Sequence, residues 1–207
     1  MRTAPMNPAA DALLEQTWAE VGARRDRRSG AIAVRPAPEP LERERMDSRP
    51  GDDFPVLAYL DAALELARGG ELAALAESFA AALDELRWSQ NAGYDEASVG
   101  RELLDSYAYA CISGPDCLQR CESPLAGYIL LGPNFEYPDH NHAPREVYLV
   151  LTPGTRWSLD SGEWFDVEVG DLIVHEPWQM HATRTGEHPF LAFAAWLERG
   201  ERSAIRI

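Results

Sequence analysis

The 207-residue sequence contains no lysine: its 19 basic residues are all arginines, set against 34 acidic residues, and the formal net charge is -15. Without lysine, neither a Schiff-base lysine nor a Walker-type phosphate loop can form. The excess of negative charge also argues against a nucleic-acid backbone or an anionic membrane surface as a partner. A hydrophobic fraction of 45% nevertheless supports a packed core. The composition therefore predicts a folded, acidic protein with neither nucleic acid nor membrane as partner.

Cysteines and long apolar segments are also scarce. The three cysteines, Cys111, Cys117 and Cys121, form no CxxC pair, and we expect them to be ordinary thiols in a reducing compartment, without a disulfide framework. No stretch approaches the roughly 18 apolar residues of a membrane span, and the first residues lack the apolar core of a signal peptide. These features predict a cytoplasmic protein.

The first half of the chain, residues 1–106, is predicted to be a helical extension. Apolar residues recur at helical spacing over residues 9–25, 55–68, 71–88 and 95–106. The arginine-rich run at 24–28 is typical of a solvated helix end, and the proline-rich stretch at 35–52 of a linker or extended wrap. The amphipathic helices could serve packing or formation of a homodimer.

From residue 107 to 207 the sequence changes to short runs rich in Val, Ile and aromatic residues, separated by Gly and Pro. The candidate strands are residues 107–112, 126–131, 146–151, 155–159, 164–168, 171–175, 181–185 and 190–197. Their spacing is typical of a small antiparallel sandwich or barrel. The fold class is therefore predicted as mainly β with an N-terminal α-helical region, in one compact unit.

Several potential metal ligands lie close together in this second half. His140 and His142 are two residues apart and would share one face of a strand, as would Glu146 and Tyr148. Two imidazoles and a carboxylate on adjacent strands suit Fe(II), Mn(II), Ni(II) or Zn(II) and leave positions open for a substrate. His181, far along the chain, is a further potential ligand.

These residues resemble the two sequence motifs of the cupin superfamily. Residues 140–146, HNHAPRE, are similar to the first motif, HxHx(3)E, and residues 170–181, GDLIVHEPWQMH, are similar to the second. The resemblance covers residues 126–197 and implies a double-stranded β-helix, or jelly roll. It also implies that one metal ion is bound by His140, His142, Glu146 and His181.

A narrower resemblance, over about residues 100–200, is to the cupin-type dimethylsulfoniopropionate (DMSP) lyases, which are bacterial proteins with a helical region before the cupin. It is carried by Tyr137, by the pair Glu146 and Tyr148, and by the segments 107–115 and 181–186. It implies a carbon–sulfur lyase that forms dimethyl sulfide and acrylate by β-elimination, with one divalent transition metal (Fe, Mn, Zn, Ni or Co). Tyr148 is then the general base, and Tyr137 orients the substrate or is an alternative base.

DMSP is a small zwitterion with a sulfonium group, and aromatic faces commonly hold such cations. The candidates in the β half are the tryptophans Trp157, Trp164, Trp178 and Trp196, of which we expect at least one to line the substrate pocket, and Tyr128, which is nearby in the sequence. The others would be ordinary core or rim residues.

Alternatives to DMSP cleavage stay open, because one fold hosts many reactions. The same ligand set could serve another metal-dependent cupin enzyme, such as a dioxygenase or isomerase, or a non-catalytic cupin that binds a small ligand. His175, six residues before His181, could be a donor behind the ligands or a plain strand-end histidine.

Overall fold

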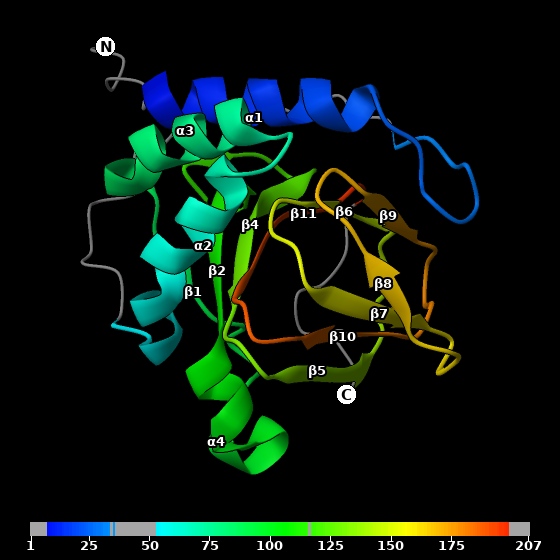
Figure 1. Cartoon of the computed structure of the whole chain (residues 1–207). Helices are drawn as coiled ribbons and strands as arrows, with labels where there is room; N and C mark the ends of the chain where they lie inside the picture. Colours follow the sequence, from blue (N-terminus) through cyan, green and yellow to red (C-terminus); the bar gives the residue numbers. More distant parts are fainter. Residues whose placement is uncertain (1–7, 34, 36–52, 116, 199–207) are drawn as a thin grey trace.

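The structure is a computed structural model of the chain, and it describes residues 8–33, 35, 53–115 and 117–198 (Figure 1). The proline-rich stretch 35–52 lies outside the described residues except for Arg35. The last nine residues of the range predicted for the barrel, 199–207, also lie outside them.

The helical region lies against one side of the β structure (Figure 1). It comprises α1 (Pro8–Gly22), η1 (Pro55–Tyr59), α2 (Leu60–Arg68), α3 (Ala73–Ala82), η2 (Leu83–Glu85) and α4 (Glu96–Ser106). A capping box between Asp95 and Ser98 begins α4, as its first-turn residues favour. The helix predicted over 71–88 ends early, since Trp88 and Ser89 form strand β1 and pair with β2. No helix in the described ranges is both long and apolar enough to cross a bilayer.

The eight predicted strands are confirmed, β1, β3 (Gln119–Arg120) and β5 (Glu136–His140) are additional, and the strands pair in two sheets. In chain order they are β2 (Tyr107–Gly114), β3 (Gln119–Arg120), β4 (Leu125–Leu131), β5 (Glu136–His140), β6 (Glu146–Val150), β7 (Thr155–Leu159), β8 (Phe165–Val167), β9 (Leu172–His175), β10 (His181–Thr185) and β11 (Phe190–Trp196). The larger sheet has the order β1-β2-β4-β11-β6-β9, with β3 beside β2, and the smaller has the order β5-β10-β7-β8. Among the eight strands from β4 to β11, β4 therefore pairs with β11, β5 with β10, β6 with β9 and β7 with β8. This order is that of a jelly roll.

Side-chain alternation along the larger sheet divides the apolar residues between two cores. In β4, Tyr128 and Leu130 pack toward the helices, whereas Ile129 and Leu131 point between the two sheets. The same alternation in β6 places Tyr148 between the sheets, while the odd-numbered residues beside it face the helices. The prediction that Glu146 and Tyr148 share one face of a strand is thus confirmed, since both line the same cavity.

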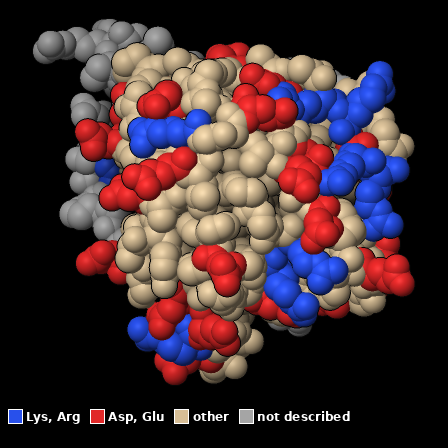
Figure 2. All heavy atoms as spheres, viewed as in Figure 1, with Lys and Arg blue, Asp and Glu red and all other residues tan. Residues whose placement is uncertain are grey.

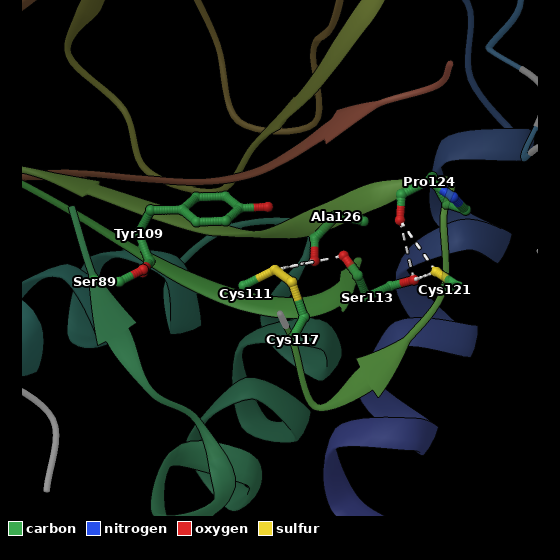
Figure 3. The surroundings of a disulfide bond; sticks show 8 residues. All are labelled: Ser89, Tyr109, Cys111, Ser113, Cys117, Cys121, Pro124 and Ala126. Carbon is green, nitrogen blue, oxygen red and sulfur yellow. Dashed lines mark hydrogen bonds between the residues drawn. A yellow bond between two sulfur atoms is a disulfide. The ribbon is translucent and has the colours of Figure 1, made fainter. Parts of the chain in front are cut away.

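The prediction of three ordinary thiols is wrong, because Cys111 and Cys117 form a disulfide near the end of β2 (Figure 3). Only six positions separate the two cysteines, and the strand-to-loop turn brings their Cα atoms to 5.2 Å. Cys121 is a buried free thiol beside the Ser113 hydroxyl (Figure 3). Disulfides are uncommon in cytosolic proteins, so the cysteines give no support to the expected cytoplasmic location.

The arginine-rich run is not a solvated helix end: α1 stops at Gly22, and the run forms a loop that is anchored by Asp26. The buried Asp26 carboxylate accepts hydrogen bonds from the loop and from the Val174 backbone N–H at 2.9 Å. Arg24 and Arg27 pair with acidic side chains around it. Figure 2 shows acidic side chains scattered over this face, with the larger groups of arginines toward the side of β8 and β9. The run therefore serves to fix the β9 edge.

Candidate metal centre and active site

The strand register brings the potential ligands to one place inside the barrel. His181, at the start of β10, lies directly opposite His140, at the end of β5. Glu146 begins β6 and lies between its two neighbours in the sheet, His175 on β9 and Trp196 on β11. The jelly-roll order thus gathers residues that are up to 56 positions apart, although His140 and His181 come from one sheet and Glu146 from the other.

These side chains are buried and close. The Glu146 Oε2 atom lies 3.0 Å from His142 Nε2 and 3.5 Å from His181 Nε2. Ligand atoms of His142, Glu146, His175 and His181 all lie within 4.8 Å of one another. The His140 ring lies beside that of His181, with a centroid separation of 4.0 Å. Three of the predicted ligands, His142, Glu146 and His181, therefore meet in one group with His175, and His140 lies beside this group against the His181 ring.

Hydrogen bonds to backbone carbonyls fix the tautomer of the three predicted ligand histidines. The Nδ1 atoms of His140, His142 and His181 lie 2.8, 2.9 and 2.9 Å from the carbonyl oxygens of Pro138, Pro144 and Gln179. A carbonyl oxygen only accepts, so each Nδ1 carries a hydrogen, and the Nε2 atoms of His140 and His181 present lone pairs, whereas His142 Nε2 is hydrogen-bonded to Glu146 Oε2. The buried Nε2 of His181 has no hydrogen-bond partner among the described residues. Such nitrogen lone pairs, held in a buried space, fit a site in which the nitrogens share one cation.

The electrostatics of the cluster agree with this fit. Burial keeps the pKa of His140 well below its ordinary value and lowers the pKa of His181 to about 4, so both rings are neutral, as metal ligands must be. Burial also opposes charge on Glu146, but the neighbouring His142 outweighs it and holds the pKa of this carboxyl well below its usual range. Burial opposes charge on His142, but the Glu146 carboxylate outweighs it and raises the pKa of that ring. The cluster thus combines one buried carboxylate with the nitrogen donors of three histidines, which suits a divalent transition metal.

The two predicted catalytic tyrosines line the cavity in front of this cluster. Tyr148 is buried, and that burial, reinforced by the charge of Glu146, raises the pKa of its phenol well above 10. Tyr137 packs edge-on to the His140 ring at 4.5 Å. Its hydroxyl lies 2.7 Å from the hydroxyl of Tyr94, a residue that is not among those predicted from the sequence. Both predicted catalytic phenols therefore line the cavity, and Tyr94 supports one of them.

Of the five aromatic candidates for the substrate pocket, Trp196 lines the cavity and donates its Nε1–H to Glu146 Oε1 at 2.9 Å. Trp157 is buried in the core between the sheets and is not among the residues that line the cavity. Tyr128 lies in the core beneath the helices and bonds Thr17, Trp164 packs against Arg184 outside, and Trp178 is 47% exposed in the loop before β10. The structure therefore does not bring Tyr128, Trp164 or Trp178 to the cavity.

Strand β2 contributes an aromatic wall that is not among the residues predicted from the sequence. Tyr107 and Tyr109 line the cavity, together with Ser89, Gln90 and Asn91 from the segment around β1. The signal was present: tyrosines two residues apart, alternating with buried alanines, point to the same face of a strand.

The strand order and the buried His/Glu cluster define a cupin-type jelly roll with a candidate metal centre. Residues 28–192 match the model of the dimethylsulfoniopropionate lyase family, and the chain belongs to that family.

Relatives and solved structures agree with this membership. The chain is 29% identical over 125 residues to the DMSP lyase DddQ of Ruegeria pomeroyi, which covers 60% of this chain and 61% of DddQ. It is 31% identical over 161 residues to the DddL protein of Cereibacter sphaeroides, covering 76% of this chain and 65% of DddL. These matches thus span less than two thirds of either relative. A crystal structure from work on the DMSP lyases RdDddP and RnDddQII superposes on this chain with a TM-score of 0.69. The two chains are 25% identical, and the superposition covers 97% of each. The DddQ structure from Ruegeria pomeroyi shows the same fold, with a TM-score of 0.66, 24% identity and coverage of 94% of this chain and 92% of DddQ.

Proposed function

We propose that the protein is a metal-dependent lyase that cleaves DMSP into dimethyl sulfide and acrylate by β-elimination. The observation that carries the proposal is the placement of Tyr148, which follows the carboxylate Glu146 by two residues on β6 and faces the same cavity. The reaction removes a weakly acidic proton from the carbon next to a carboxylate, and this step needs a base close to the metal ligands. Family membership and the names of the relatives support DMSP as the substrate.

His140, His142, Glu146 and His181 would hold one divalent transition metal, namely Fe, Mn, Zn, Ni or Co. When bound, the cation would act as a Lewis acid toward the substrate carboxylate and favour the ionised form of a nearby phenol. The choice among these metals follows geometry and availability.

Tyr148 would act as the base, with its phenolate oxygen taking the proton from the carbon next to the substrate carboxylate. The electrons of that C–H bond form the C=C bond of acrylate, and the electrons of the breaking C–S bond leave with sulfur as neutral dimethyl sulfide. Tyr137, held by Tyr94, would orient the substrate. The rings of Tyr107 and Tyr109 offer the sulfonium an aromatic wall in place of hydrogen-bond acceptors.

The test is release of dimethyl sulfide. Protein freed of metal with a chelator and then loaded with Fe, Mn, Ni, Co or Zn is incubated with DMSP, and headspace dimethyl sulfide is measured against the chelated protein. We expect release with at least one metal and none from the chelated protein. No release above buffer with any of the five would contradict the proposal. Binding of DMSP without release would indicate a non-catalytic cupin instead.

A further inference from the structure

We propose that His175 is a positioning residue that fixes the Glu146 carboxylate for the metal, with its own tautomer set by Trp157. His175 ends β9, directly opposite Glu146 on β6, and is fully buried. The inference rests on the proposed metal site, but it is independent of the identity of the substrate.

The tautomer of His175 follows from its two partners. The indole Nε1–H of Trp157 lies 2.9 Å from His175 Nε2, and an indole N–H only donates, so Nε2 accepts. The hydrogen of the neutral ring is therefore on Nδ1, which donates to Glu146 Oε2 at 3.0 Å. Trp157 on β7 thus sets the tautomer of His175, and this tautomer donates an N–H to the Glu146 carboxylate.

This arrangement is the reverse of that in His140 and His181. Those two donate from Nδ1 to a backbone carbonyl, which leaves the Nε2 lone pair facing the cluster. In His175 the Nε2 lone pair is taken by Trp157, and Nδ1 carries a hydrogen. Neither nitrogen of His175 can therefore bind a cation, although one of them lies within 4.8 Å of the ligand atoms of His142, Glu146 and His181. His175 therefore acts behind the metal ligands.

Glu146 is held from both flanking strands. Trp196 on β11 donates to Oε1 at 2.9 Å, and His175 on β9 donates to Oε2 at 3.0 Å. The His175 ring also stacks on that of His181, with centroids 3.7 Å apart and planes 24° apart. Partners behind the ligands commonly change metal affinity by about 10–100-fold when they are removed. His175 is placed to orient two ligands at once.

The test compares metal affinity in variants that keep or remove the N–H. His175→Asn retains a side-chain N–H that can reach Glu146, His175→Leu removes it, and Trp157→Phe frees His175 to change tautomer. His188→Asn, at an exposed turn, is the matched control, and His142→Asn removes a proposed ligand. Apo proteins are titrated with Co(II) in competition with a chelator. The Co(II) absorption spectrum reports the ligand set, and thermal unfolding of the apo form reports folding.

We expect His175→Leu and Trp157→Phe to bind Co(II) about 10–100-fold more weakly with the ligand-field spectrum of a four-ligand site retained. His175→Asn should restore affinity to within a few-fold of the original protein, and His188→Asn should not change it. If His175→Leu does not fold, the contrast between His175→Asn and Trp157→Phe decides the question.

Two results would overturn the proposal. Loss of affinity and a changed spectrum in His175→Asn, matching His142→Asn, would make His175 a ligand. Unchanged affinity in Trp157→Phe and His175→Leu would show that His175 does not position Glu146. Co(II) binding is measured without DMSP. The role of His175 can therefore be decided even if the protein does not cleave DMSP.

Discussion

Trp196 donates its indole N–H to the Oε1 atom of Glu146 across the β11–β6 register, at 2.9 Å. This bond places a pocket-lining aromatic residue in direct contact with the carboxylate of the candidate metal centre. The cavity wall and the ligand set are therefore one connected unit, and a change in the wall is expected to alter metal binding.

Trp196→Phe should weaken both metal binding and turnover. A hydrogen bond to a charged group contributes about 1.5–3 kcal/mol, so we expect metal affinity to fall by about one to two orders of magnitude. Chelator competition measures the affinity, and dimethyl sulfide release at saturating metal measures the remaining activity. Trp164→Phe, outside the cavity against Arg184, is the control and should change neither. Equal effects in the two variants would contradict this role.

Tyr94→Phe should lower kcat/KM for DMSP without changing metal content. The substitution removes only the hydroxyl that lies 2.7 Å from that of Tyr137. A net hydrogen-bond contribution of about 0.5–1.5 kcal/mol corresponds to roughly a two- to tenfold loss. Tyr59→Phe, at an exposed tyrosine, provides the comparison. An unchanged kcat/KM in Tyr94→Phe would show that Tyr94 does not support Tyr137.

Asp26→Ala should destabilise the fold by about 1–3 kcal/mol, because the variant leaves buried N–H groups without an acceptor. Burial opposes the charge of Asp26, but hydrogen bonds from Ser29, Val174 and Arg28 lower its pKa below that of the unfolded chain. Its contribution to the free energy of unfolding is therefore present above pH of about 4 and is lost as pH falls through the folded pKa.

Urea denaturation at neutral and acidic pH measures this contribution, with the exposed Asp53→Ala as control. The difference between Asp26→Ala and the original protein should shrink in acid. A difference that is constant with pH would exclude the charged carboxylate as its source.

The disulfide predicts a thiol count. With Cys111 and Cys117 joined, the denatured and unreduced protein should show one reactive thiol, from Cys121, and three after reduction. Closing so short a loop should contribute about 2 kcal/mol to stability on chain entropy. Three reactive thiols before reduction would contradict the pairing.

The sequence predicts the strands and the ligand cluster because their signals are local. The alternation around Tyr148 describes a single strand and needs no knowledge of distant contacts. The prediction that His140 and His142 lie in one strand is wrong, because β5 ends at His140 and His142 follows it, yet both still reach the site. The same reasoning cannot say which face of β4 points inward. That face is set by the helices that cover Tyr128, so the choice of Tyr128 as a pocket residue could not be tested from the sequence.

Other features depend on contacts between distant residues. The role of His175 follows from Trp157, which lies 18 positions earlier on the opposite sheet. The pairing of Cys111 with Cys117 follows from the turn after β2, which the cysteine spacing does not show. In both cases the residue type was visible, and only the tertiary partner determined its chemistry.

The most direct test of the account is dimethyl sulfide release by Tyr148→Phe at saturating metal, with metal content measured in the same sample. We expect metal content equal to that of the original protein and a loss of kcat by about 10²–10⁴-fold, the usual contribution of a general base. Retention of kcat within a few-fold, with the metal bound, would contradict the assignment of Tyr148 as the base.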